Sequence, residues 1–417
     1  MVDSSERVSS GSTAVTSLKE ELEELALAGR GWHAVLRRLS QSSGRRIRLV
    51  GVHGGLLAAS DRSEDLKTSL SVPASGIRAS DRMDEGVDAS HVAEVFATDE
   101  QTSIVCTDGF RARVTPVHAG ARRIGLLLME EPVSKRQSQL LDASRLAVAI
   151  EAVRRDAEAK ARAESASRLI DELRFGSLRE PEELVRAAER FGIELEQPHA
   201  AAVFAYDGPS QRTWSTAISW IEMPVRSGRG LGWTVLTGDI RAEVRRIRAR
   251  LQGIVGDRDP VLTAAGPLVT GLENTPRSFR EAEIVLAMLR RRSGEVELIF
   301  ESLGLTGLLL SLPRDRLEAF VARFLGPILD RDDLLTTLAV WYKANGSRAA
   351  VASRLNVHRN SVGYRIARIK QKLGLDPLDP WVGPQLQAGL ACREVLTALT
   401  DLTEGGAVNG ETRESER

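Results

Sequence analysis

The spacing of apolar positions divides the chain into segments of helical and of strand character. Leucines recur at helical spacing between Leu22 and Leu39, and four short runs of β type follow them, at residues 47–52, 103–107, 113–117 and 124–129. Short strands separated by turns that contain Gly and Asp are typical of one antiparallel sheet with helices on one side. We therefore expect a small α+β domain of the sensor type over residues 18–135.

The next segment, residues 136–176, has the pattern of a long helix. It contains no proline and no glycine before its last position, and its apolar residues lie 4, 3 and 4 positions apart at Leu146, Ile150, Val153 and Ala157. This apolar seam weakens at Lys160 and Glu164, so a strict coiled coil is not expected. We interpret the segment as a helical linker that dimerises over part of its length.

Strands and amphipathic helices alternate in the middle of the chain. Strand patterns occur at residues 200–206, 233–237 and 261–265, and helices are expected after Asp239 and from Thr275. This alternation predicts a second α+β or α/β domain, which we assign to residues 177–325. The glycine run SGRGLGW precedes a strand instead of following one, so we interpret it as a turn and not as a nucleotide-binding fingerprint.

The rest of the chain divides into a helical domain and two polar ends. The pattern becomes all helical over residues 326–402. Residues 1–17 and 403–417 are rich in Ser, Gly, Thr and charge and have almost nothing to bury, so we expect both to be disordered. The fold class that follows is α+β, with several domains.

Composition excludes several classes of protein. The 417 residues include 57 basic and 57 acidic side chains, so the net charge gives no overall sign of a nucleic-acid or membrane partner. The chain has neither an apolar leader nor a run of 18 apolar residues, which favours a cytoplasmic protein without a membrane span. The two cysteines, Cys106 and Cys392, lack the spacing of metal ligands. Nucleophile-elbow, Walker A, HExxH and EF-hand motifs are absent, so we expect no enzyme, no metal and no cofactor.

Positive charge is concentrated in one part of the C-terminal domain. Residues 334–375 contain no Asp or Glu but eight basic residues, namely Lys343, Arg348, Arg354, Arg359, Arg365, Arg368, Lys370 and Lys372. A basic segment in an otherwise balanced chain is what binding to DNA phosphates requires. On charge alone, a solvated helical face is the alternative interpretation.

The apolar pattern of this basic segment predicts a helix-turn-helix. Ser347 can cap a first helix, and Asn356 can adopt the left-handed conformation of a tight turn. A second helix would bury Val362, Ile366, Ile369 and Leu373, which lie 4, 3 and 4 positions apart. Two helices joined in this way are typical of DNA readers, in which the second helix enters the major groove.

The exposed side and the start of the second helix carry the candidate DNA contacts. Asn360 can bond an adenine edge, Arg359 can contact guanine or phosphate, and Ser361 and Tyr364 can reach a base or the backbone. Arg365 and Arg368 are expected to bind phosphate. The full candidate set is Ser347, Arg348, His358, Arg359, Asn360, Ser361, Tyr364, Arg365 and Arg368.

Two residues of the second helix leave alternatives open. Gly363 lowers the helix propensity of this segment. Glycine is present there either because a side chain would obstruct a close approach to DNA or as a neutral accident. Tyr364 can also pack against the preceding helix through Trp341 or Tyr342 instead of contacting DNA.

The run from Thr337 to Pro380 closely resembles the C-terminal helix-turn-helix of the PucR/CdaR family of bacterial transcriptional regulators. The resemblance rests on Leu355, on residues 357–366 and on Gly374; Ser361 stands where threonine is usual and keeps the hydroxyl. More weakly, residues 266–283 look like the degenerate GGDEF-like domain of that family. The GG[DE]EF signature is absent, so the resemblance implies no cyclase activity. It also implies a GAF-like or PAS-like sensor in the N-terminal third.

We therefore predict a DNA-binding transcriptional regulator that is not an enzyme. A small-molecule effector would bias the sensor domain, and residues 136–176 would pass this change to a homo-dimer or higher oligomer whose readers bind double-stranded DNA. The alternative is a nucleotide-binding or nucleotide-processing protein that acts through the middle domain, with the basic helices as a protein-interaction surface. The sequence leaves open the operator, activation or repression, the effector, and whether the middle domain binds a nucleotide.

Overall fold

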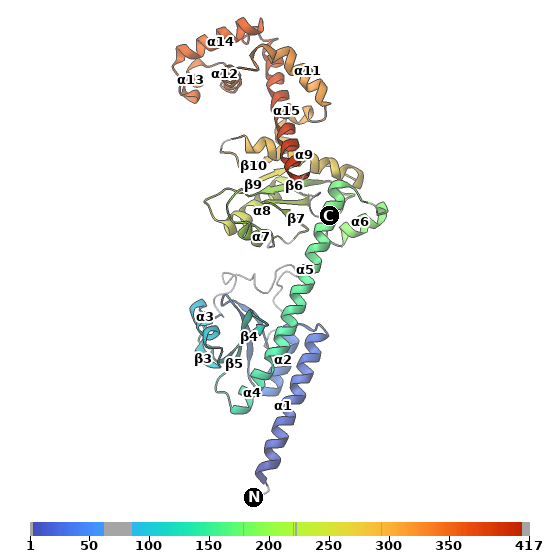
Figure 1. The fold of residues 1–417 in the computed structure, drawn as a ribbon, viewed down its shortest axis with the longest axis vertical. Coiled ribbons are helices and arrows are strands. Elements are labelled where there is room, and N and C mark those ends of the chain that lie inside the picture. Colours follow the sequence, from blue (N-terminus) through green and yellow to red (C-terminus); the bar gives the residue numbers. More distant parts are fainter. Residues whose placement is uncertain are drawn as a thin grey trace. The chain divides into compact units, whose positions relative to one another are not determined.

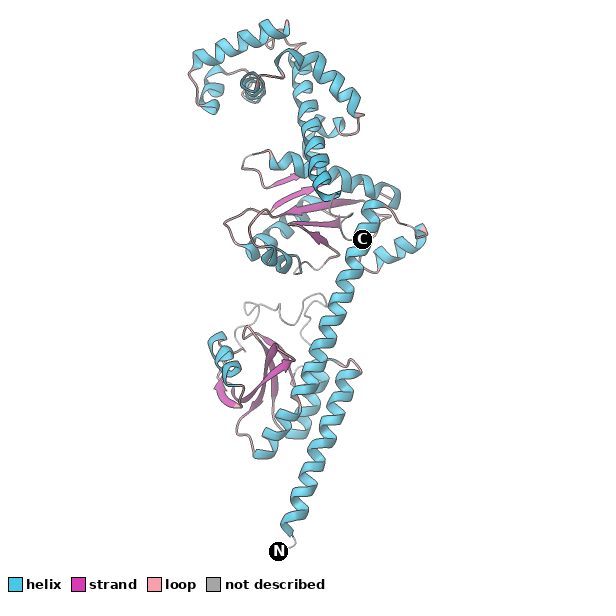
Figure 2. Ribbon diagram, viewed as in Figure 1, coloured by secondary structure: helices cyan, strands magenta, loops and turns pink. Residues whose placement is uncertain are grey.

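The computed structural model describes residues 3–61, 86–177, 179–219, 221, 223–292 and 294–410. The chain forms two units (Figures 1 and 2), one of residues 1–166 with 219–222 and one of residues 167–218 with 223–417. The boundary between these units falls within the long helix α5 (Arg145–Phe175).

The first unit is built on one antiparallel five-stranded sheet. Its strands lie in the order β2-β1-β5-β4-β3, with bounds β1 (Ile47–Gly51), β2 (Leu56–Ala59), β3 (Thr102–Val105), β4 (Arg111–Ala119) and β5 (Arg122–Glu130). Its helices are α1 (Asp3–Leu27), α2 (Gly31–Ser43), α3 (Ala89–Thr98), α4 (Lys135–Ala143) and the first part of α5.

Both faces of this sheet are buried. Leu49 and Leu127 belong to a core shared with α1, α2, α4 and α5, whereas Val50 and Leu126 belong to a core shared with α3. Successive strand residues point to opposite faces, so strands covered on both faces read as almost continuous apolar runs. The prediction of helices on one side only was therefore wrong, because α3 covers the second face.

A buried carboxylate joins α5 to the α1–α2 corner. The Glu151 side chain has no exposed area and accepts hydrogen bonds from Arg154 Nε (2.9 Å) and Nη2 (2.7 Å) and from Arg155 Nε (2.9 Å). The Arg155 guanidinium lies over the Trp32 ring at 4.4 Å, and Arg154 lies beside Gly29, where an added Cβ would be 3.1 Å from the guanidinium. One acidic side chain therefore orients two arginines that both touch the corner.

Four expected strands of the first unit are confirmed, but several details differ. The sequence pattern missed β2, which has only four residues, and α3, whose start depends on the Asp88 side chain accepting from Ser90 N at 2.8 Å. The expected helix over residues 136–176 is two helices. A capping box at Ser134 and Gln137 starts α4, and Ser144, whose hydroxyl bonds Leu140 O at 2.6 Å, separates α4 from α5.

The chain ends are more ordered than expected. Residues 3–17 form the first part of α1, so the prediction of disorder there was wrong. Leu18, Leu22 and Ala26 are buried in the core of the first unit, and packing of these turns supports helix extension toward the N-terminus. At the other end α15 (Gly383–Gly410) includes residues 403–410, and the last seven residues lie outside the described part of the chain.

The middle domain opens the second unit with another five-stranded sheet. The strands lie in the order β10-β9-β6-β8-β7, with bounds β6 (His199–Ala205), β7 (Arg226–Gly228), β8 (Leu231–Thr237), β9 (Leu262–Ala265) and β10 (Glu297–Ile299). β9 and β10 pair in parallel, and the other pairs are antiparallel. The helices of this domain are α6 (Pro181–Glu189), α7 (Gln211–Ser219), α8 (Ile240–Val255) and α9 (Thr275–Arg290).

Local sequence signals in the middle domain explain where α8 begins and how β7 turns into β8. Asp239 caps α8 by accepting from Ala242 N at 3.1 Å, as its position predicts. Arg229 and Gly230, with φ of 48° and 77°, form the tight turn between β7 and β8, so the glycine run is the simple turn that we expected. A Cβ on Gly230 would lie 2.5 Å from the Tyr206 carbonyl oxygen, which leaves no room for another residue.

The end of α5 belongs to the middle domain and not to a separate linker. Leu169, Ile170 and Leu173 are buried in the core of the second unit. Next to them, the Arg174 guanidinium forms an ion pair with Glu283 and lies 4.1 Å from the centre of the Trp233 ring. The predicted linker boundary at residue 176 is therefore too late by about two helical turns.

The remaining helices of the second unit are α10 (Leu305–Leu309), α11 (Arg314–Leu325), α12 (Asp332–Lys343), α13 (Arg348–Leu355), α14 (Arg359–Leu373) and α15. The long helix α15 packs against α9 of the middle domain and against α10 and α11. Ion pairs from Arg292 to Glu394 (3.0 Å) and from Arg291 to Asp401 (2.9 Å) support the contact with α9. One hydrophobic core consequently runs from the end of α5 to α15.

We expect Glu151→Ala to destabilise the protein by about 1–3 kcal/mol, because it removes a fully buried carboxylate that accepts hydrogen bonds from two partly buried guanidinium groups. Thermal unfolding of the full chain, followed by circular dichroism, measures this loss. The matched control is Glu158→Ala, which removes the exposed partner of the same Arg154 and should cost at most about 1 kcal/mol. Equal losses in the two variants would contradict the role given to Glu151.

Candidate nucleic-acid interface

Helices α13 and α14 form the helix-turn-helix that the sequence predicts. Ser347 caps α13 by accepting from Ala350 N at 3.3 Å, and Asn356 has the left-handed φ of 53° that the turn requires. The expected burial is found at Val351, Ala352, Val362, Ile366 and Ile369, whereas Leu373, which was also expected to be buried, is only partly buried. These buried positions fix which side of α14 faces away from the protein.

His358 gives α14 its N-terminal cap. Its Nδ1 accepts a hydrogen bond from Asn360 N at 3.2 Å, and Gly374 ends the helix with a φ of 66°. Candidate DNA-binding residues therefore include two capping residues, Ser347 and His358, whose side chains order the first turns of the two helices. The capping role of His358 was not anticipated from the sequence.

The predicted reading residues lie exposed at the start of α14. Arg359, Asn360 and Ser361 are all solvent-exposed, and Tyr364 is 65% exposed. Its hydroxyl accepts from Arg368 Nη1 at 3.4 Å, while Tyr342 donates to Pro377 O at 3.2 Å. The alternative in which Tyr364 packs against Trp341 or Tyr342 is thus not what the structure shows.

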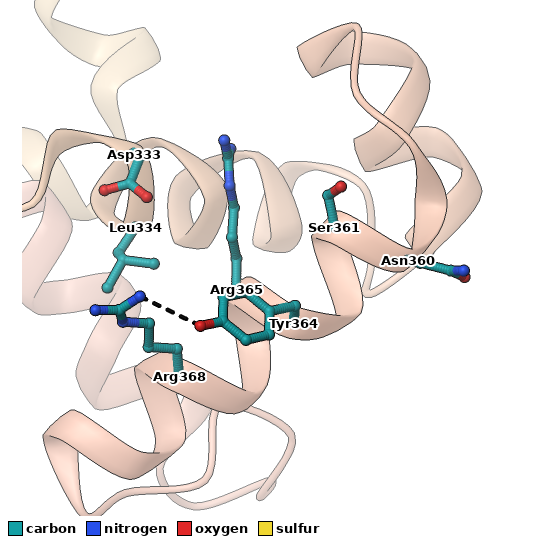
Figure 3. Close-up of a pocket in the computed structure, with 7 residues that line it drawn as sticks. All are labelled: Asp333, Leu334, Asn360, Ser361, Tyr364, Arg365 and Arg368. Carbon is teal, nitrogen blue, oxygen red and sulfur yellow. Dashed lines mark hydrogen bonds between the residues drawn. The ribbon is translucent and has the colours of Figure 1, made fainter.

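A groove of about 450 Å³ runs between α12 and α14 (Figure 3). Its lining contains five of the nine candidate residues, Asn360, Ser361, Tyr364, Arg365 and Arg368, together with Asp333 and Leu334 of α12. In Figure 3 the Asn360 side chain points away from the other six. Asp333 was not among the residues predicted from sequence, although its position as the last acid before the basic segment is a usable signal.

Arg365 is tied to α12 across the floor of this groove. Its Nη1 donates to Thr337 Oγ1 at 3.2 Å, and the Thr337 hydroxyl donates to Asp333 O at 2.6 Å. Arg331 holds the Asp333 carboxylate with two bonds of 3.2 Å. Desolvation opposes ionisation of Asp333, but the hydrogen bonds and charge of Arg331, with the charge of Arg365, hold its pKa below the usual range.

The other side of α14 faces Arg348, the first residue of α13. A Cβ built on Gly363 would lie 3.8 Å from Arg348 Nη1, which is ordinary van der Waals contact. A small side chain therefore fits at position 363 within the protein itself. Whether it would obstruct DNA stays a prediction.

The described residues also bear on two other kinds of site. Within these residues, no group of three or more His, Cys, Asp and Glu side chains is placed to hold a metal ion. None of the described helices combines the length and the apolar character that crossing a membrane requires.

Two segments of the chain match known domain families. Residues 334–392 match the PucR C-terminal helix-turn-helix domain, and residues 175–288 match the GGDEF-like domain. The matched ranges contain the helix-turn-helix and most of the middle-domain sheet. Both domain types are those that the sequence predicted.

Two relatives share stretches of sequence with the chain. The carbohydrate diacid regulator of Escherichia coli (strain K12) is 28% identical over 242 residues, which are 50% of this chain and 62% of that protein. An uncharacterized protein in the pkwA 5' region of Thermomonospora curvata is 42% identical over 73 residues, 16% of this chain and 41% of that protein. The chain thus spans less than two thirds of the length of each relative.

A solved structure, that of the regulator of polyketide synthase expression from Bifidobacterium adolescentis, also matches. It is 16% identical, covers 55% of this chain and 97% of its own, and superposes with a TM-score of 0.29. At that score the overlay does not bear on the arrangement of the domains.

We expect His358→Ala to destabilise the protein by about 1 kcal/mol through loss of the helix cap. His358→Asn should recover most of this stability, because asparagine is a favoured capping residue. Thermal unfolding of the full-length variants measures both changes. Recovery of stability without recovery of DNA affinity in His358→Asn would assign the imidazole a contact with DNA; no loss in His358→Ala would contradict the capping role.

Proposed function

We propose that the chain is a helix-turn-helix transcriptional regulator of the PucR/CdaR family, to which residues 334–392 and the carbohydrate diacid regulator are similar, and that it binds double-stranded DNA through α14. The observation that carries the proposal is the exposed start of α14, where Arg359, Asn360 and Ser361 lie within a segment that has eight basic residues and no acidic one. Such a surface combines phosphate attraction with side chains that can distinguish bases.

Each exposed residue has a role in this proposal. The Asn360 side chain points away from the other lining residues of the groove (Figure 3), so it is placed to bond an adenine edge. Arg359 contacts guanine or phosphate, and Ser361 and Tyr364 contact a base or the backbone. Arg368 binds phosphate, since its long bond to the Tyr364 hydroxyl leaves it donors to spare. Arg365 can do so only in part, because Thr337 occupies one of its donors.

We propose binding, and not catalysis, as the work of the middle domain. The relative whose name states a function is a regulator, and the hairpin between β7 and β8 carries Arg229 and Gly230 without a GG[DE]EF signature. This domain would hold the reader in place, whether or not it also binds a nucleotide.

The first unit would act as a GAF-like or PAS-like sensor for a small molecule. What supports this assignment is its five-stranded antiparallel sheet with helices over both faces. A DNA-binding regulator with such a sensor would act in the cytoplasm, where it meets both its effector and its operator.

A homo-dimer would use the uncovered side of α5. Leu146 and Val153, two members of the predicted seam, are 48% and 51% exposed, whereas Ala147, Val148 and Ala152 of the same turns are buried in the first unit. Exposed apolar residues seven positions apart can pair with the same residues of a second copy. A dimer also supplies the second reader that a specific operator requires.

The DNA-binding proposal predicts a difference between reading and phosphate contacts. Asn360→Ala and Arg359→Ala should weaken binding to the operator by roughly 5- to 150-fold each and should reduce sequence discrimination. Arg368→Ala should weaken binding to all duplexes similarly and reduce the salt slope by about one unit.

Fluorescence anisotropy of the full chain, on a duplex selected from a random-sequence pool and on its scrambled version, measures these effects across a salt series. Arg316→Ala is the control, because it removes an exposed arginine of α11, outside the helix-turn-helix of α13 and α14. A wild-type protein that binds neither duplex would refute the proposal.

The dimer proposal predicts that Leu146→Glu and Val153→Glu shift the protein toward monomer, because they place carboxylates opposite each other in the seam. Analytical ultracentrifugation over a concentration series measures the shift. The control is Glu158→Lys, an exposed position on a different side of α5. If all three variants keep the wild-type mass, dimerisation does not use this side of α5.

A further inference from the structure

The groove between α12 and α14 contains one negative charge. Of its seven lining residues two are arginines, four are uncharged and one, Asp333, is acidic. In the sequence Asp333 directly precedes the 42 residues from 334 to 375 that lack any acid. A carboxylate beside the reading helix opposes the phosphate attraction that the surrounding basic residues produce.

The Asp333 carboxylate is held in the groove and remains open to solvent. Its side chain is 38% exposed, and both of its oxygens are bonded by Arg331 at 3.2 Å. Each carboxylate oxygen can accept more than one hydrogen bond, so this pairing leaves acceptor capacity on the exposed side. Its lowered pKa keeps it ionised wherever the protein is folded near neutral pH.

An ionised carboxylate in a DNA interface distinguishes two kinds of group. It repels a phosphate, and it accepts a hydrogen bond from the exocyclic amino group of cytosine in the major groove. The neighbouring lining residues Ser361 and Tyr364 carry hydroxyls, which tolerate either group. Arg365 and Arg368, the two arginines of the lining, attract phosphate on the α14 side, so a preference for a base edge on the α12 side falls to Asp333.

We propose that Asp333 is a specificity-determining residue of the DNA interface, whose carboxylate occupies Arg331, weakens phosphate attraction on the α12 side of the groove between α12 and α14, and selects a base that presents an amino group, such as cytosine. This inference rests on the proposed function, since it assigns a further contact to the same DNA-binding surface. It makes Asp333 the residue that lowers non-specific affinity while it adds one position of sequence preference.

The chain offers a matched control at the neighbouring residue. Asp332 is also acidic and also lies in the first turn of α12, but its side chain is 89% exposed, lies 3.6 Å from Arg393 and does not line the groove. Asp332→Asn and Asp333→Asn change the net charge equally, so a difference between them reports position and not charge. Asp333→Glu restores the carboxylate on a longer side chain.

The test uses the full-length protein, the duplex that the wild type selects from a random-sequence pool, its scrambled version, and every single-base-pair variant of the selected duplex. Asp333→Asn should bind scrambled DNA several-fold more tightly, with a salt slope steeper by about 0.9, the value for one added phosphate. It should also lose a preference of roughly 5- to 150-fold at one base pair. Asp332→Asn should do neither, and Asp333→Glu should keep the wild-type preference.

Three results would overturn the inference, and they separate it from the proposed function. If the wild type selects no duplex, DNA binding itself fails. If the wild type binds but Asp333→Asn and Asp332→Asn behave alike, Asp333 contributes only net charge. If Asp333→Asn tightens binding to the selected and scrambled duplexes equally, the carboxylate selects no base. Thermal unfolding of each variant confirms that all are folded, and Asp333→Ser replaces Asp333→Asn if that variant is not.

Discussion

The burial of one side of α14 is the constraint on which the proposed DNA-binding surface depends. Val362 and Ile369 have no exposed area, and Ile366 is nearly as buried, so α14 cannot rotate about its axis without exposing this apolar stripe. With the rotation fixed, residues half a turn away must face outward. The positions of Asn360 and Tyr364 therefore follow from packing and need no contribution from DNA.

Side chains that cap and orient helices refine this arrangement. His358 and Ser347 supply the acceptors at the starts of α14 and α13, and both residues are exposed. Arg365, by contrast, is drawn toward α12 by Thr337. The proposed DNA-binding surface consequently combines residues that stabilise the fold with residues that do not, and a substitution at a capping residue affects both stability and binding.

The elements that could be predicted from sequence are those with long periodic patterns or strong local chemistry. The helix-turn-helix, with its 4-3-4 spacing and its left-handed Asn356, is of this kind, and so are β6, β8 and β9. The misses are short or depend on distant partners. β2 has four residues, the start of α3 requires Asp88, and the end of α5 joins the middle domain because Leu169 and Leu173 find partners far along the chain. Asp333 was missed for a similar reason, since only folding brings α12 beside α14.

The single hydrophobic core from the end of α5 to α15 has a mechanical consequence. Helix α15 contacts both α9 and α11, and the Arg292–Glu394 ion pair joins it to the middle domain. The helices α13 and α14 are thus held by a folded body and not by a flexible tether. The conformational entropy lost in ordering them is lost when the second unit folds, before any DNA binds. Because the last turns of α5 and helix α14 belong to the same folded body, a movement of these turns also moves α14. A small rotation at Leu173 would therefore displace α14, with no hinge of disordered chain between them.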